Sequence, residues 1–360
     1  MQFIQRNVRY VLPIVFFGYA AVVNLGYAKL PGLSEVALDR TALTGALTAK
    51  LDEVYRHSMP HREPAIGVIG ALRYLALGEG RKGVVTGDDG WLFTSEELRP
   101  MDQAMAVPLA RIAEVRDTLA AAGATLVIVP VPGKLDVYRD AASADEAAGI
   151  ATLYDGFLGG LKAEGVAVVD ARAALAAAAT TELAFFRTDT HWTPRGAEAV
   201  AKALAASGLI APGDTGFSVD TGAQATFTGD LVSYVTTDAI APLIGFAPEA
   251  AAPYTAVPAA DEASLDIFAG TEAGGTILIG TSYSANPNWS FAEALKLALG
   301  RDVLNLAVEG QGPARPMLGY LASTAFRDTP PEVVIWEFPV RYLSDPAIWQ
   351  PESKEVKSGA

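Results

Sequence analysis

The segment Thr276-Ile-Leu-Ile-Gly-Thr-Ser-Tyr-Ser284 joins a run of apolar residues directly to a turn of small hydroxyl residues. The apolar run, which stops at Gly280, is typical of a short strand that is buried on both faces of a sheet. The small residues that follow indicate a tight turn at the carboxyl end of this strand. Enzymes with an α/β fold expose a nucleophile at such a turn, so the segment predicts an α/β fold with Ser282 at its functional edge.

The same apolar pattern recurs along the chain and alternates with helical periodicity. Short apolar strands separated by helices predict a doubly wound, mostly parallel sheet that helices cover on both faces. Because ligands bind beyond the carboxyl ends of such strands, we expect Ser282, Asn305 and residues 337–341 to gather at one edge. The expected strands are 124–129, 166–169, 276–280, 303–306 and 333–338, and the expected helices are 111–122, 150–164, 290–299 and 314–325.

Local signals predict where several elements begin and turn. Residues 84–93 alternate around an Asp-Asp-Gly sequence, which predicts a hairpin. Thr193 fits the N-cap of a helix whose first residue is Pro194. Ser290 and Glu293 have the spacing of a capping box at the start of another helix.

The N-terminal residues predict a membrane segment. Residues 10–28 carry no charge over nineteen positions, roughly the length that crosses a hydrocarbon layer of ~30 Å. Arg6 and Arg9 precede this segment, which favours an N-terminus in the cytoplasm and export of the remainder. Residues 26–28 also fit the cleavage site of a signal peptide, so an uncleaved anchor and a cleaved leader both stay open. In either case we expect the globular part to work outside the cytoplasmic membrane.

The chain is expected to divide into four parts. Residues 208–270 are rich in Pro, Gly, Thr and Ala and break the α/β rhythm, so we expect an insertion or a lid there. The four parts are a membrane anchor or signal segment at 1–30, a helical lead-in at 31–83, the α/β domain at 84–345 and a C-terminal tail at 346–360.

Composition excludes several classes of function. A formal net charge of −14 argues against nucleic-acid binding, which needs clustered Lys and Arg. The absence of cysteine excludes disulfides, thiolate metal sites and cysteine nucleophiles. We expect no metal site, because no second His, Cys or carboxylate pair stands at ligand spacing, and no cofactor.

Asp189, His191 and Ser282 supply the groups needed for acyl transfer through a serine ester. His191 is one of only three histidines, and residues two apart in an extended segment point the same way, so Asp189 could orient it. Trp192 would close the site against water or stack on a sugar. On the residues alone, Ser282 also fits an ordinary turn, and Asp189-Thr-His191 also fits a helix cap or a surface hydrogen bond.

Several motifs resemble those of the alginate O-acetylation proteins, the periplasmic SGNH-hydrolase-like acetyltransferases of bacterial exopolysaccharide systems. The resemblance covers roughly residues 84 to 345, and the order and spacing of the motifs make it specific. The motifs are Gly90-Trp-Leu-Phe93, Val131-Pro-Gly-Lys134, Asp189-Thr-His-Trp-Thr193, Gly280-Thr-Ser-Tyr-Ser284, Asn305 with Gly310-Gln-Gly-Pro313, and Trp336-Glu-Phe-Pro-Val-Arg341.

This resemblance implies Ser282 as nucleophile, His191 as base and Asp189 as the group that orients the base. It also implies a membrane-tethered member without the C-terminal carbohydrate-binding module of some relatives. Such members work in the periplasm beside a membrane-bound O-acyltransferase that supplies the acetyl group.

The leading hypothesis is therefore an exported O-acetyltransferase that moves acetyl groups onto a polysaccharide such as alginate. A polysaccharide acetyl esterase, and a non-catalytic polysaccharide-binding scaffold, are the alternatives. Lys134 and Arg341 could hold an anionic polymer, or could be ordinary salt-bridge partners. The residues expected to bind substrate or the oxyanion are Trp192, Tyr283, Asn305, Gln311, Lys134 and Arg341.

Overall fold

The computed structural model describes residues 2–27, 62–99, 105–142, 144–259 and 275–350, together with residues 45, 48, 49, 52 and 53. The chain divides into two compact units, Met1–Leu72 and Arg73–Ala360. Much of the expected lead-in at 31–83, most of the expected tail at 346–360 and residues 260–270 of the expected insertion lie outside the described residues.

The first unit contains α1 (Gln2–Tyr27), which covers most of the segment where the sequence predicts a membrane span. Pro13 lies inside this helix. None of the helices in the described ranges is both long enough and apolar enough to cross a bilayer. The membrane anchor therefore stays a prediction from the sequence. Helix α4 (Arg62–Leu77) runs across the boundary between the two units in the chain.

The second unit is built on a five-stranded parallel sheet with the strand order β10-β9-β11-β3-β4. Parallel neighbours need crossover connections, which the intervening helices provide. The predicted parallel sheet is thus confirmed, and each of the expected strands is present. The strands are β3 (Thr125–Val131), β4 (Ala167–Val168), β9 (Thr276–Ile279), β10 (Val303–Asn305) and β11 (Val333–Pro339).

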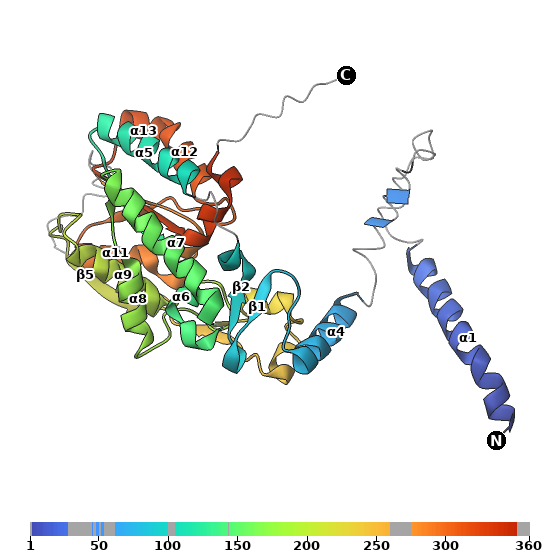
Figure 1. The fold of residues 1–360 in the computed structure, drawn as a ribbon. Coiled ribbons are helices and arrows are strands. Elements are labelled where there is room, and N and C mark those ends of the chain that lie inside the picture. The colour runs from blue at the N-terminus through green and yellow to red at the C-terminus, as the bar shows by residue number, and fades with distance from the viewer. Residues whose placement is uncertain are drawn as a thin grey trace. The chain divides into compact units, whose positions relative to one another are not determined.

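Helices cover both faces of this sheet (Figure 1). Because side chains alternate in direction along each strand, each face of the sheet contributes to a separate hydrophobic core. Ile128, Ile279 and Trp336 belong to the core on one face, whereas Val129 and Ile335 belong to the core on the other. The helices on the first face are α5 (Ala106–Ala121), α7 (Ala144–Ala163), α12 (Ala314–Leu321) and α13 (Thr324–Asp328), and those on the second are α8 (Ala171–Ala179), α9 (Pro194–Ala206) and α11 (Phe291–Leu299).

The packed core reaches further along the chain than the expected domain boundary at residue 345. Trp349 ends a 3-10 turn, Pro346–Trp349, and is fully buried. Its ring lies 5.9 Å from that of Trp336 and 5.1 Å from that of Phe338, between centroids. The α/β domain therefore extends at least to Trp349.

Two of the three local predictions are confirmed. Strands β1 (Val84–Thr86) and β2 (Leu92–Thr94) form the expected antiparallel hairpin. The Thr193 hydroxyl caps α9 by accepting a hydrogen bond from the N–H of Gly196 at 3.1 Å.

The predicted capping box at α11 is wrong. Ser290 has a left-handed backbone with φ of 53°, and its side chain does not cap the helix. The Ser290 hydroxyl accepts a hydrogen bond from the N–H of Tyr254, and the Glu293 carboxylate accepts one from the N–H of Ala256, both at 2.9 Å. The two polar side chains thus bind a neighbouring strand instead of their own helix.

The strand they bind belongs to an arm, residues 217–258, which forms most of the described part of the expected insertion. The arm contains two antiparallel strand pairs, one nested within the other in the chain, and the strands of the inner pair are joined by a segment with 3-10 turns at Asp230–Tyr234 and Ala241–Ile244. The first pair joins β5 (Phe217–Thr221) to β8 (Tyr254–Pro258), and the second joins β6 (Ala225–Phe227) to β7 (Glu249–Ala251).

Candidate active site

Ser282, His191 and Asp189 meet in a continuous hydrogen-bonded chain. Ser282 is the first residue of α10 (Ser282–Ala285), the short helix that follows β9, and Asp189 and His191 lie in the loop before α9. The Nε2 atom of His191 lies 2.7 Å from Oγ of Ser282, and its Nδ1 atom lies 2.7 Å from Oδ1 of Asp189. This is the geometry in which an imidazole can take a proton from a hydroxyl while a carboxylate fixes its tautomer.

Asp189 is held in place as an ionised carboxylate. Its Oδ1 atom also accepts a hydrogen bond from the backbone N–H of His191 at 2.9 Å, and its Oδ2 atom accepts one from the N–H of Asp230 at 3.0 Å. Burial alone would raise the pKa of Asp189, but the hydrogen bonds and charge of His191 together with the backbone donors lower it below its ordinary value. The group beside the imidazole therefore carries a negative charge at neutral pH.

We term the loop that carries these residues, 187–191, the histidine loop. The side chain of Lys134 holds this loop through hydrogen bonds to its backbone. The Nζ atom of Lys134 donates to the carbonyl oxygens of Leu92, Arg187 and Asp189 at 2.6, 2.8 and 3.0 Å. Lys134 is buried, and burial lowers its pKa to about 8. The suggestion that Lys134 holds a polymer is therefore wrong, because its three donors already bind the backbone.

The ring stacked near His191 is Trp289 and not Trp192. Trp192 is fully buried, and its indole N–H donates to the carbonyl of Tyr283 at 3.0 Å, so it has no face free for a sugar. The Trp289 ring lies 5.3 Å from the imidazole with an interplanar angle of 25°. Sequence reasoning missed Trp289 because it falls in a short turn, Pro287–Trp289, that contains no recognised motif.

Tyr283 and Arg341 are buried next to the site and hold it through hydrogen bonds. The Tyr283 hydroxyl donates to the carbonyl of Thr190 at 2.6 Å and accepts from Nη1 of Arg341 at 2.9 Å. Arg341 is 6% exposed and also binds the carboxylate of Glu96 at 3.1 Å. Both side chains are therefore bonded within the protein, and neither is available to bind a substrate. For Arg341 this agrees with the alternative prediction, that it is an ordinary salt-bridge partner.

A buried carboxylate positions the turn that carries Ser282. Oε2 of Glu337, at the end of β11, accepts hydrogen bonds from the N–H of Thr281 at 3.0 Å and from the hydroxyl of Ser284 at 2.7 Å. Burial raises the pKa of Glu337. A β-carbon added at Gly280 would lie 2.5 Å from the same Oε2 atom, so this close approach requires glycine.

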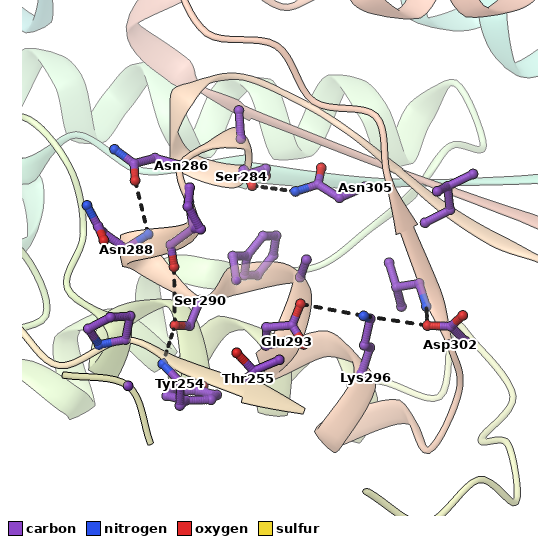
Figure 2. A pocket seen from close by; sticks show the side chains of 18 residues that line it. Tyr254, Thr255, Ser284, Asn286, Asn288, Ser290, Glu293, Lys296, Asp302 and Asn305 are labelled. Atoms are coloured by element: carbon purple, nitrogen blue, oxygen red, sulfur yellow. Dashed lines mark hydrogen bonds and ion pairs between the residues drawn. The ribbon is translucent and has the colours of Figure 1, made fainter. Parts of the chain in front are cut away.

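Asn305 and Gln311 line two different cavities. The Nδ2 atom of Asn305 donates to the carbonyl of Ser284 at 2.7 Å, which places its side chain against α10. Asn305 borders a cavity of about 600 Å³ that also includes Asn286 and Asn288 (Figure 2). Gln311 is exposed and borders a second cavity of about 960 Å³. Of these two residues, only Asn305 is placed directly beside the helix that carries the serine.

Figure 2 shows how the first cavity is walled. Asn286, Asn288 and Asn305 come from the segments around α10 and β10, and an ion-paired row, Glu293–Lys296–Asp302, runs along another side. The lining is thus rich in neutral hydrogen-bonding groups, and its cation is paired with two carboxylates.

A second carboxylate, Asp230, lies beside the catalytic constellation, and sequence reasoning missed it. One ligand-type atom from each of Asp189, His191 and Asp230 lies within 4.8 Å of the others, a spacing at which such groups could hold a metal ion. Both oxygens of each carboxylate instead accept hydrogen bonds from N–H or O–H groups of the protein. The observed geometry is therefore that of a hydrogen-bonded network. No sequence signal pointed to Asp230, because it is forty-one residues from Asp189 in the arm.

Comparisons of the whole chain with known proteins give consistent results. A family model described as "SGNH hydrolase-like domain, acetyltransferase AlgX" matches residues 84–340. The chain is 37% identical to the probable alginate O-acetylase AlgJ of Pseudomonas syringae pv. tomato, over 94% of this chain and 89% of that protein. It is 35% identical to the Pseudomonas aeruginosa counterpart, over 95% and 91% of the two chains. Among solved structures, the O-acetyltransferase domain of Pseudomonas putida AlgJ superposes with a TM-score of 0.65 and 39% identity, covering 73% of this chain and 93% of that one.

Proposed function

Because the chain belongs to the alginate O-acetylase AlgJ family, whose domain is an SGNH-hydrolase-like acetyltransferase, we propose that it acetylates hydroxyl groups of alginate through an acetyl-serine intermediate. The observation that carries this proposal is the unbroken contact from Asp189 through His191 to Ser282.

In the first half of the reaction, Ser282 Oγ attacks the carbonyl carbon of the acetyl donor. His191 Nε2 takes the hydroxyl proton, and Asp189 stabilises the resulting imidazolium at Nδ1. The imidazolium then gives the proton to the leaving group, which departs and leaves acetyl on Ser282. In the second half, His191 takes the proton of a sugar hydroxyl, whose oxygen attacks the acetyl carbon. The intermediate then expels Ser282 Oγ, which takes the proton back from the imidazolium, and the acetylated sugar departs.

The negative oxygen of each tetrahedral intermediate needs hydrogen-bond donors. We place these at the backbone N–H of Ser282 and at the side chain of Asn305, because the N–H groups of Thr281, Tyr283 and Ser284 donate to other groups of the protein. This placement is supported by the contact of Asn305 with the carbonyl of Ser284, two residues from the nucleophile. A single donor of this kind typically contributes about 10²–10³ in rate.

The proposed site of action is the periplasm, with a membrane-bound O-acyltransferase as the acetyl supplier. Support comes from the sequence, where two arginines precede nineteen uncharged residues at the N-terminus. A reporter enzyme that works only after export, fused after residue 360, should be active in cells. A reporter that is inactive there, while the fusion accumulates, would contradict the periplasmic assignment.

The mechanism is tested by replacing Ser282 with Ala. Purified protein is incubated with an activated acetyl ester and alginate oligosaccharides, and acetylated sugar, free acetate and acetyl-protein are measured by mass spectrometry. We expect Ser282→Ala to lose transfer by more than about 10³-fold. Ser218→Ala, at an exposed serine of the arm, serves as the matched control and should retain activity. Wild-type transfer by Ser282→Ala would eliminate the acyl-enzyme, and free acetate as the sole product would indicate an esterase.

A further inference from the structure

Asp230 connects the arm to the histidine loop through both its backbone and its side chain. Its N–H donates to Asp189 Oδ2 at 3.0 Å, on the side of that carboxylate away from His191 Nδ1. Its own carboxylate accepts from the N–H and the hydroxyl of Thr190, at 2.8 and 2.7 Å. The arm thus donates a hydrogen bond to the histidine loop and also accepts hydrogen bonds from it.

The backbones of these segments also approach each other closely. A β-carbon at Gly229 would lie 2.3 Å from the carbonyl carbon and oxygen of Thr188, so only glycine fits before Asp230. The N–H of Leu231 donates to the carbonyl of Thr188 at 3.2 Å. This fit gives Asp230 one defined position relative to the imidazole.

Asp230 also places a second carboxylate near His191, because one ligand-type atom from each residue lies within 4.8 Å of the other. Both of its oxygens accept hydrogen bonds, as those of an ionised carboxylate do, although burial and the charge of Asp189 raise its pKa. Among the described residues, no salt bridge to Asp230 is formed, so no cation in direct contact neutralises it. A nearby negative charge favours the protonated form of an imidazole.

We propose that Asp230 is a positioning residue of the acyl-transfer site, which fixes the orientation of Asp189 and whose carboxylate favours the imidazolium that forms during the reaction. This inference rests on the proposed acetyl transfer. When the proton leaves Ser282 Oγ for His191 Nε2, the imidazolium is stabilised by Asp189 in direct contact and by Asp230 through space. A catalytic group that is misplaced by about 1 Å can cost about 10²-fold in rate, so a residue that holds Asp189 in one orientation affects the reaction.

Other charged or titratable groups near His191 do not duplicate this role. Lys134 lies under the loop and opposes the two carboxylates, and Arg341 is directed at the hydroxyl of Tyr283. Tyr283 is neutral because burial raises its pKa. Glu249 binds the N–H and hydroxyl of Thr188, at the start of the histidine loop.

The test is the pH profile of kcat/KM for Asp230→Asn in the full chain, with an activated acetyl ester as substrate. Asparagine has the shape of aspartate and keeps the backbone N–H but removes the charge. Because the neutral imidazole is the active base, we expect the limb that reports His191 to move to lower pH by about 0.5–1 unit. We also expect kcat/KM on the plateau to fall by about 10-fold, because Asp189 is held less well in its productive orientation. Asp230→Ser removes the same charge with a different side chain and should give the same shift.

Two further variants distinguish a specific effect of the Asp230 carboxylate from a general effect of changing the charge or the hydrogen bonds of the arm. Asp238→Asn removes an exposed carboxylate of the same arm and should leave the profile unchanged. Thr190→Val removes one hydrogen bond to Asp230 but leaves its carboxylate in place, so its limb should move less than that of Asp230→Asn. An unshifted limb in both Asp230 variants, or an equal shift in Asp238→Asn, would overturn the proposal. Loss of wild-type activity on chelation would overturn it as well, in favour of a metal site. The results with the Asp230 and Asp238 variants would leave the acetyl-serine mechanism standing, which the Ser282 variant tests, whereas a metal ion bound by His191 would contradict both proposals.

Discussion

Glu337 is a fully buried carboxylate with no direct cationic partner among the described residues, and it holds the turn before the nucleophile. Its oxygens accept hydrogen bonds from the backbone and hydroxyl of Thr281 and from the hydroxyl of Ser284. Burial raises its pKa. The folded protein therefore keeps a proton on Glu337 over a pH range in which the unfolded chain has lost it.

This linkage predicts a specific pH dependence of stability. Wherever the folded state binds more protons than the unfolded state, the free energy of unfolding falls as pH rises. The free energy of unfolding should thus fall as the pH rises from the ordinary pKa of Glu337 to its raised pKa, and should stay lower above it. Glu337→Gln should show a flatter curve over this range. Urea unfolding at several pH values from 4 to 8 measures this. Glu332→Gln, at an exposed glutamate just before the same strand, should keep the wild-type slope, and a wild-type slope in Glu337→Gln would contradict the assignment.

Single residues show what the sequence could and could not predict. The meeting of Ser282, His191 and Asp189 was predictable from their residue types and from the family resemblance, and Ser282 follows a sheet strand as expected. The histidine loop lies between α8 and α9 and follows no strand of the parallel sheet, so its position beside Ser282 could not be derived from the strand pattern. The roles of Lys134 and Trp192 were not predictable either. A charge or a ring next to a motif looks the same in the sequence whether it faces the cleft or the core, and both of these side chains face the core.

At the scale of elements, the approach of β11 to the end of β9 depends on one glycine. Gly280→Ala would place a methyl group 2.5 Å from the Glu337 carboxylate and 3.0 Å from the Ser284 hydroxyl. We expect a loss of about 1–3 kcal/mol in stability, because neither neighbour can move without breaking a hydrogen bond, together with a marked fall in acetyl transfer.

Gly275, at the other end of β9, provides the matched control. A β-carbon there would meet nothing within 4 Å, so Gly275→Ala should stay within about 1 kcal/mol of the wild type. Thermal unfolding and the rate of ester turnover are measured for both variants, and only Gly280→Ala should show a clear loss in each. Equal behaviour of the two would show that the strand end tolerates a side chain.

The parallel strands were predictable as elements, whereas the arm was not. Each central strand is a continuous apolar run that is buried on both faces, which gives a strong signal. The strands of the arm are three to five residues long and mostly exposed, so they have no apolar run. The capping-box prediction at α11 failed for a related reason, since the strand that uses Ser290 and Glu293 could not be foreseen.

For the whole molecule, the division into two units predicts that the α/β domain folds without the N-terminal region. A chain that begins at residue 62 should unfold cooperatively, with a Tm within about 3 °C of the full chain, and should cleave activated acetyl esters at the same rate. A chain that begins at residue 80 loses Tyr74, whose ring lies 4.8 Å from that of Phe246, and should melt earlier. Calorimetry of both shortened chains tests this, and an unfolded protein from the chain that begins at residue 62 would refute it.

The histidine loop is fastened by side chains that are far from it in the sequence. Lys134, Asp230 and Glu249 each bind its backbone, and Glu97 in turn binds the N–H of Lys134. Natural variation or random mutagenesis scored by loss of acetylation should therefore yield many hits at these four codons. Substitutions that abolish acetylation should therefore be more frequent at the residues that hold the histidine loop than at the residues that contact the polymer.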